Sequence, residues 1–221
     1  GLRCMWQVEI DEWRRSILAK HWPDVPRHDD IRTFNPPSTP DIIVGGYPCK
    51  QTSNAAAIHN KRSGLAGQQS GLWFEMLRVV RECQPDWVVV ENTAGAATWQ
   101  DTIKAGLESA GYCVPDKPVA LSASGFGAPH RRRRLFWIAD RDGKGLAIAR
   151  QAGPPEAVSV AGRAIAGDAW RASDARTVRV ADRAPGRLDR RRRIESVGDA
   201  VCPPVAEWIA RRIVAAEAAK H

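Results

Sequence analysis

Two stretches decide the fold: Asp41-Ile42-Ile43-Val44-Gly45-Gly46-Tyr47-Pro48-Cys49 and Trp87-Val88-Val89-Val90-Glu91-Asn92. Each contains an unbroken apolar run, and continuous apolar residues are typical of strands that are buried on both faces. In an open parallel sheet, reactive groups lie in the crevice at the carboxyl ends of the strands. The sequence therefore predicts that a thiol, Cys49, and a carboxylate, Glu91, meet at one edge of a sheet.

Strands and helices alternate along the rest of the chain. The apolar patterns predict strands over 5–8, 41–44, 87–90, 119–122 and 135–139, and helices over 12–19, 71–83 and 102–110. A terminal helix is expected after Pro203-Pro204, with Val205, Trp208, Ile209 and Ile213 on its apolar stripe. This alternation predicts an α/β fold, with a sheet of parallel strands and helices on both faces.

The composition divides the 221 residues into three segments. Residues 1–140 carry the alternating pattern and form the expected main domain. Residues 141–187 are rich in Ala, Gly, Arg and Pro, with weak periodicity, and we expect a small irregular insert there. Residues 188–221 return to the main domain. Because the chain begins with Gly1 and enters a strand almost at once, we expect a fragment whose beginning lies upstream.

The charge and the cysteines restrict the partners and the compartment. The formal net charge is +8, which favours a polyanionic partner, with nucleic acid first. The five cysteines are scattered without a CxxC pair, so we expect no metal site and no disulfide framework. We find no apolar run of transmembrane length and no signal-peptide pattern, and we therefore expect a cytoplasmic protein with no membrane partner.

Cys49 and Glu91 are the candidate catalytic groups. A buried cysteine is most often inert, but Cys49 follows a Gly-Gly turn at a strand end, with Lys50 beside it. A thiolate in such a place can attack an electrophilic carbon. Glu91 could cap a helix or could protonate the nitrogen of a heterocycle. The pair favours the catalytic interpretation over either residue alone.

Other charged positions indicate a nucleic acid and a nucleotide-like cofactor. The run 130–134 contains four arginines and enters a strand directly, and arginine makes bidentate contacts to phosphate or to a base oxygen. Glu9 ends the first strand, where a carboxylate can accept hydrogen bonds from ribose hydroxyls. Asp30 and Ile31 could contact an adenine amine and its ring face, although ordinary loop chemistry also explains both.

In this order along the chain, these motifs resemble the DNA (cytosine-5) methyltransferases, particularly the compact bacterial and phage forms. The resemblance covers residues 1–139 and about 190–213 and includes Gly198-Asp199-Ala200-Val201. It implies that Cys49 adds to carbon-6 of a flipped-out cytosine in double-stranded DNA, that Glu91 acts as the acid, and that the methyl group of S-adenosylmethionine is transferred to carbon-5. Arg134 would contact the cytosine carbonyl oxygen, and Arg132 would support the active-site loop.

The resemblance also implies a cofactor pocket and a Rossmann-like methyltransferase fold. The residues matching that pocket are Glu9, Ile10, Asp30, Ile31, Pro48, Leu72, Asp199 and Ala200. Residues 53–70 match a mobile loop that closes over the flipped base. The 141–187 insert stands where the family has its target-recognition domain. A restriction endonuclease is a candidate partner, and we expect a monomer.

The sequence departs from the family at several positions. The opening strand and its glycine-rich turn are absent, Lys50 stands where glutamine is commonest, Thr93 replaces valine, and Asp199 replaces asparagine. Two alternatives therefore stay open beside the DNA methyltransferase. One is a non-catalytic DNA-binding remnant, and the other is an RNA cytosine-5 methyltransferase with the same motifs.

Overall fold

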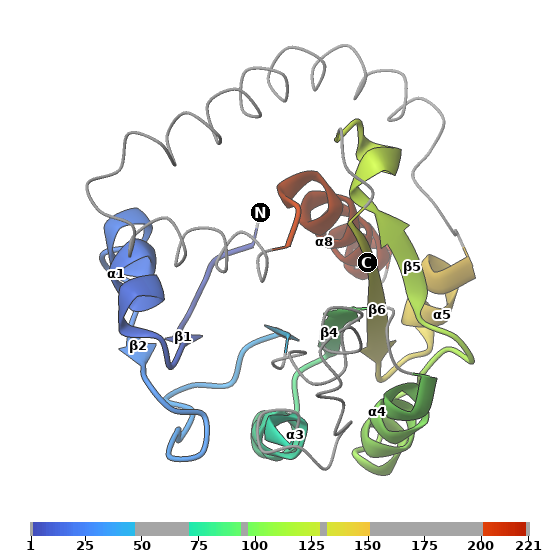
Figure 1. Ribbon diagram of the computed structural model, residues 1–221. Coiled ribbons are helices and arrows are strands. Elements are labelled where there is room, and N and C mark those ends of the chain that lie inside the picture. The colour runs from blue at the N-terminus through green and yellow to red at the C-terminus, as the bar shows by residue number, and fades with distance from the viewer. Residues whose placement is uncertain (1, 47–70, 94–96, 129–131, 151–200, 220–221) are drawn as a thin grey trace. The chain divides into compact units, whose positions relative to one another are not determined.

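A computed structural model describes residues 2–46, 71–93, 97–128, 132–150 and 201–219 (Figure 1). The chain separates into two compact units. The first comprises residues 1–120 and 134–152, and the second comprises residues 121–133 and 153–221. The candidate residues Pro48, Cys49, Asp199 and Ala200, the 53–70 loop and most of the 141–187 insert lie outside the described ranges. None of the described helices is long and apolar enough to cross a membrane.

The main sheet of four strands has the order β3-β4-β6-β5. Its strands are β3 (Ile42–Gly45), β4 (Trp87–Thr93), β6 (Arg133–Asp140) and β5 (Val119–Ser122). β3 and β4 are parallel, as predicted, with Ile43 opposite Val88 and Gly45 opposite Val90. Val88 and Val90 are completely buried, which confirms the burial predicted for β4. β3 corrects the same prediction, because it is an edge strand and its Val44 is 68% exposed.

β6 corrects the prediction of a parallel sheet, because it runs antiparallel to β4. β6 is also the neighbour of β5, and only residues 123–132 connect the two strands. A parallel pair needs a crossover of a dozen or more residues, usually with a helix, so this short connection favours a reversal of direction at β6. The ladder continues to the pair of Thr93 and Arg134. β4 is therefore longer than predicted, and Glu91 lies inside the strand rather than after it.

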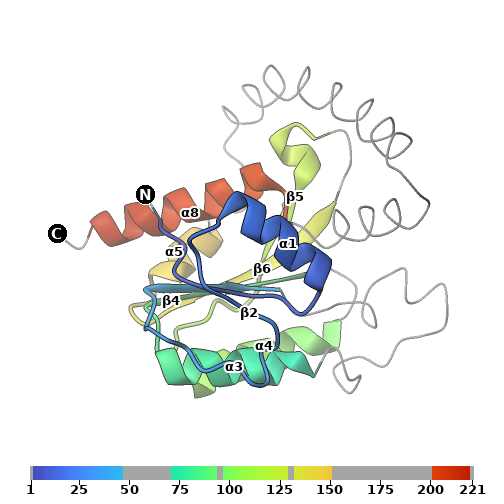
Figure 2. The same cartoon turned by 90° about the vertical axis from the view of Figure 1, so that its left-hand side faces the viewer.

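α3 (Leu72–Cys83) and α4 (Ala97–Ser109) cover one face of this sheet (Figure 2). α3 follows the predicted bounds to within a residue and ends at Gln84, whose φ of 50° is left-handed. α4 begins before the predicted 102 and is followed by Gly111, whose φ is 89°. The core between the helices and the strands includes Trp73, Val80, Trp99, Ile103 and Leu107, all completely buried.

A second, two-stranded parallel sheet is formed by β1 (Gln7–Val8) and β2 (Arg27–His28). β2 was not predicted, since its residues are polar and too few to show a period. The intervening α1 (Glu12–His21) is two residues longer than predicted, and the Asp11 side chain caps it by accepting the Arg14 N–H at 2.9 Å. Trp6 and Val8 pack against the same core cluster as α3.

Two more helices complete the description. α5 (Lys144–Arg150) corrects the expectation of an irregular insert from residue 141 onward. It lies against β6, because a Cβ on Gly145 would stand 2.7 Å from the Ile138 carbonyl oxygen.

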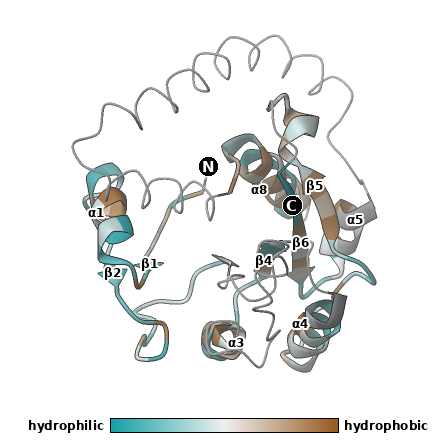
Figure 3. Ribbon diagram, viewed as in Figure 1, coloured by the Kyte–Doolittle hydropathy of each residue, from teal (hydrophilic) through white to brown (hydrophobic). Residues whose placement is uncertain are grey.

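In the second unit, α8 (Pro203–Ala218) buries the four predicted stripe residues. It contacts the short 3₁₀ helix η2 (Ala123–Phe126) through Trp208 and Phe126, whose rings are 6.3 Å apart. In β6 the apolar residues 135–139, which Figure 3 colours by hydropathy, are all buried, whereas the strand begins with two arginines that are not.

Candidate active site

The parallel register of β3 and β4 places Gly46, the residue that follows β3, beside Glu91. Gly45 pairs with Val90, so the next residue of each strand, Gly46 and Glu91, follows at the same edge. A Cβ built on Gly46 would stand only 2.9 Å from Glu91 Oε2. The predicted meeting of the two strand ends is therefore confirmed up to Gly46, and Cys49 itself lies beyond the described part of that turn.

Glu91 forms an ion pair with Arg134 on the neighbouring antiparallel strand. The Nε of Arg134 lies 2.9 Å from Glu91 Oε1, and the two side chains are 19% and 12% exposed. Thr93 is directly opposite Arg134, so Glu91 and Arg134 lie diagonally on the same face of the sheet. The sequence predicted both residues, but only the antiparallel direction of β6 explains how the first residues of that strand reach the last residues of β4.

Asn92 follows Glu91 in β4, and its side chain has a structural role that the sequence analysis does not predict. It points to the opposite face from Glu91, and only 1% of it is exposed. Its Oδ1 accepts the Thr93 N–H at 2.6 Å. A buried amide that binds the backbone in this way stabilises the end of β4, on which Glu91 depends. Its neighbours in the strand, Glu91 and Thr93, both face the other side of the sheet.

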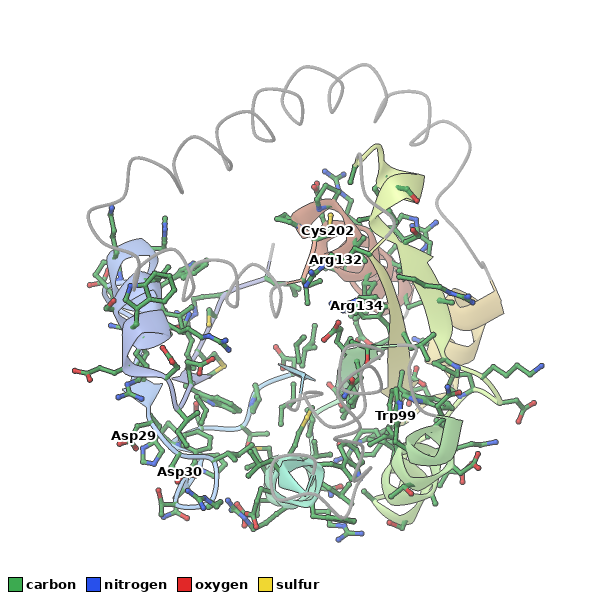
Figure 4. The ribbon with its side chains drawn as sticks, in the orientation of Figure 1. Asp29, Asp30, Trp99, Arg132, Arg134 and Cys202 are labelled. Atoms are coloured by element: carbon green, nitrogen blue, oxygen red, sulfur yellow. The ribbon has the colours of Figure 1, made fainter. Side chains whose placement is uncertain are left out.

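The predicted nucleoside ligands follow the two strands of the small sheet. The Glu9 N–H donates to the His28 carbonyl at 3.0 Å, which brings the end of β1 beside the end of β2. The Glu9 carboxylate accepts the Asp11 N–H at 2.9 Å, and Ile10 is 61% exposed. The neighbouring residues Asp29 and Asp30 lie just after β2 (Figure 4).

Asp30 is already held by a cation. Arg32 donates from Nε to both carboxylate oxygens at 3.0 Å, and its backbone N–H donates at 2.9 Å. The side-chain hydrogen bond from Arg32, followed by the backbone bond, lowers the pKa of Asp30 to about 2. The Asp30 carboxylate is therefore ionised near neutral pH and can only accept hydrogen bonds. Ile31 packs against the core, and Leu72, the other described pocket residue, is half-buried at the start of α3.

Arg132 belongs to the second unit. Its φ is 31°, which is uncommon for a residue with a side chain, and its carbonyl accepts the Ala123 N–H at 3.4 Å. The charge of Arg132 acts on Cys202 (both labelled in Figure 4), which precedes α8. Burial raises the pKa of the Cys202 thiol, while the Val205 backbone bond and then Arg132 lower it. The structure thus gives Arg132 a neighbour that the sequence did not predict.

These observations define a mixed α/β protein with a carboxylate and a guanidinium paired on the two central strands of its main sheet. The family model described as C-5 cytosine-specific DNA methylase matches residues 1–163, and the chain belongs to that family.

The chain is similar to several characterised proteins. Type II methyltransferase M.BsuFI of Bacillus subtilis is 29% identical over 143 residues, which cover 62% of this chain and 33% of that protein. Type II methyltransferase M.HhaI of Haemophilus parahaemolyticus is 27% identical over 149 residues, covering 64% and 43%. The chain thus spans less than half the length of these relatives. Among solved structures, a mutant of Spodoptera frugiperda DNMT2 gives a TM-score of 0.50 at 17% identity, covering 63% of this chain and 43% of that one. This likeness concerns the fold alone.

Proposed function

We propose that this chain carries the catalytic strand ends of an enzyme that transfers a methyl group from S-adenosylmethionine to carbon-5 of a flipped-out cytosine in DNA. The observation that supports the proposal best is the buried ion pair of Glu91 and Arg134 beside Gly46. Cys49 follows Gly46 by three residues, and a fully extended chain of that length spans at most about 11 Å. On that ground we assign the Cys49 thiol to the same site as this pair.

In the proposed reaction, each residue acts on a different atom of the pyrimidine. The Cys49 thiolate adds to carbon-6, and the ring electrons move toward carbon-5. Glu91 holds the exocyclic amine and, in its protonated form, gives a proton to ring nitrogen-3 and takes it back when the product forms, while Arg134 donates a hydrogen bond to the carbonyl oxygen. Bound S-adenosylmethionine would supply the electrophilic methyl group to carbon-5, and its sulfur would leave as the neutral thioether of S-adenosylhomocysteine. A base then removes the carbon-5 proton, and the thiolate leaves as the ring double bond re-forms.

The ion pair suits this task because it fixes both groups before a base arrives. Glu91 and Arg134 come from the two central strands of the main sheet, where the backbone is held on both sides. Preorganised polar groups in a site that excludes water stabilise developing charge without reorganisation. Arg134 can keep its Nε beside Glu91 Oε1 and offer the other side of its planar fork to the cytosine.

The nucleoside end of the cofactor fits the small sheet. The exposed Ile10 offers an apolar surface beside the Glu9 carboxylate, which can accept hydrogen bonds from ribose hydroxyls. The Asp30 carboxylate retains lone pairs that can accept an adenine amine, although Arg32 already occupies part of it. We assign Pro48, Leu72, Asp199 and Ala200 to the same pocket on the family resemblance. We also retain 1–140 and 188–221 as the catalytic domain and 141–187 as the recognition insert.

The test is tritiated methyl transfer to unmethylated DNA, with covalent trapping on DNA that contains 5-fluorocytosine. Wild type should label cytosine and form the adduct, whereas Cys49→Ser should do neither and should still bind DNA. Arg134→Lys keeps a positive charge but loses the planar fork, so it should lower turnover more than DNA affinity. Turnover of Cys49→Ser near the wild-type rate would refute the role of the thiol.

The same assay separates the alternatives. DNA binding without transfer or trapping would favour the non-catalytic remnant, and transfer to RNA in preference to DNA would favour the RNA methyltransferase. DNA affinity should also fall steeply as salt rises, because each phosphate contact releases counterions. An affinity that is flat with salt would argue against the basic residues as the DNA-binding surface.

A further inference from the structure

Arg78 lies in the middle of α3, and all three nitrogens of its guanidinium are engaged. Its Nε donates to Glu75 Oε2 at 3.0 Å, and its Nη1 donates to the two carboxylate oxygens of Glu82 at 2.9 and 3.0 Å. Both glutamates are on the same helix, one turn before and one turn after Arg78. Together they hold the planar guanidinium in one orientation, and they raise its pKa.

The remaining nitrogen of Arg78 reaches out of the helix to a distant turn. Its Nη2 donates to the Ile31 carbonyl at 2.7 Å and to the Phe34 carbonyl at 3.2 Å. The same 30–34 turn is closed by Thr33 N–H donating to Asp30 O at 3.2 Å and by Phe34 N–H donating to Ile31 O at 3.4 Å. Arg78 therefore connects α3 to both ends of a backbone turn that begins at Asp30.

Phe34 anchors the other side of this turn. It is 4% exposed, belongs to the core cluster, and packs on Trp6 with ring centroids 4.9 Å apart. The turn is thus held in two ways: the Phe34 side chain packs in the core, and Arg78 of α3 donates to the turn's carbonyl groups. Without the cation, the Phe34 carbonyl would lose the Arg78 donor, and the Ile31 carbonyl would keep only the Phe34 N–H at 3.4 Å.

We infer that Arg78 is a positioning residue for the nucleoside end of the cofactor: it holds the 30–34 turn so that Asp30 and Ile31 meet the adenine. This inference rests on the proposed function, because the turn matters for binding only if it receives a nucleoside. Lysine cannot replace arginine here, because one ammonium group cannot span two carboxylates on α3 and two carbonyls on the turn.

The experiment compares Arg78→Lys with a matched control, Arg81→Lys. Arg81 is on the same helix, but its Nη2 donates to Ser109 Oγ on α4 at 2.8 Å, away from the turn. Two measurements are made on each full-length chain. Amide hydrogen exchange of Thr33 and Phe34 is followed without ligand, and the dissociation constant for S-adenosylhomocysteine is measured by equilibrium dialysis.

Arg78→Lys should speed exchange at Thr33 and Phe34 and should weaken S-adenosylhomocysteine binding by about tenfold, the effect of losing one or two charged hydrogen bonds. Arg81→Lys should change neither. Glu82→Gln, a milder change that releases one side of the guanidinium, should give an intermediate result if Arg78→Lys fails to fold. Wild-type exchange and affinity in the Arg78 and Glu82 variants would overturn the inference.

The two proposals fail in different ways. If wild type does not bind S-adenosylhomocysteine, the proposed function fails for this chain and the nucleoside role of Arg78 fails with it. If wild type binds and Arg78→Lys binds equally well despite faster exchange, only the positioning role is refuted. Slower turnover at saturating cofactor would likewise refute it, because a residue that positions the nucleoside should act on affinity.

Discussion

Replacing Gly46 by alanine tests how closely the turn after β3 approaches the candidate acid. The added Cβ would stand 2.9 Å from Glu91 Oε2, whereas an ordinary contact of this kind begins near 3.4 Å. The carboxylate would have to retreat by about half an ångström, yet its other oxygen is held by Arg134 at 2.9 Å. Overpacking of a tight site typically costs about 1–3 kcal/mol, and we expect Gly46→Ala to lower the free energy of unfolding by that amount.

A double-mutant cycle, measured by urea unfolding, shows whether Glu91 is the cause. In a Glu91→Ala background the carboxylate is gone, and the remaining neighbours of the Gly46 Cβ are at 3.5 Å and beyond, so the alanine should cost little. In a Glu91→Gln background the side chain keeps its shape, so the cost should remain. Gly45→Ala is the control in the wild-type background, because its Cβ would meet only the flexible end of Met76.

The catalytic consequence follows from the same displacement. A misplacement of 1 Å at a reacting group can cost about 100-fold in rate, so half that distance should lower methyl transfer by about tenfold. Gly45→Ala should leave the rate within about threefold of wild type on the same scale. An equal cost of Gly46→Ala in all three Glu91 backgrounds, or an equal loss of rate in both glycine variants, would refute the reasoning.

Three further predictions concern the fold. Val44→Thr should change the unfolding free energy by less than about 0.5 kcal/mol, since Val44 is 68% exposed. Val88→Thr buries a hydroxyl and should cost about 1–3 kcal/mol. Equal changes for the two variants in urea unfolding would contradict this. Tyr112→Phe removes the bond from the buried hydroxyl to the Pro85 carbonyl at 2.8 Å and should lower the thermal midpoint, with about 1–2 kcal/mol lost. Burial raises the pKa of Asp140, so the ionised carboxylate destabilises the folded state increasingly as the pH rises above 3.8. Asp140→Asn should therefore gain stability relative to wild type between pH 3 and pH 7. A difference in unfolding free energy that stays constant with pH would count against this.

Much of the fold could be predicted because burial leaves a clear pattern. The strand over 119–122 and the α3 helix agree with the structure to within a residue, and the four stripe residues of α8 are all buried. These elements are long or strongly apolar on one side, so their periodicity is unambiguous. The end of β3 at Gly45 was predicted to within a residue, whereas β4 continues through Glu91 to Thr93, because its polar last residues pair with β6.

The missed features are those that periodicity does not encode. β2 consists of Arg27 and His28, which show no apolar run at all. The direction of β6 depends on the length of the connection before it, which an alternating α/β pattern does not weigh. α5 lies in an Ala- and Gly-rich segment, where its helical pattern was not recognised. Arg78 could have been noticed from its spacing to Glu75 and Glu82, but its reach to the 30–34 turn is a tertiary contact.

The candidate site therefore depends on two kinds of support. Glu91 and Arg134 are fixed by the register of β4 and β6, so any change that moves them must also disturb the central sheet and should appear as lost stability. The 30–34 turn and Gly46 follow β2 and β3: Arg78 holds the turn, and the absence of a side chain at Gly46 permits its close approach to Glu91. Substitutions at these two positions should change cofactor affinity and rate more than their effect on global stability would suggest. The sequence therefore indicates Glu91 and Arg134, which lie in regular strands. The positioning roles of Arg78 and Gly46 are seen only in the tertiary contacts.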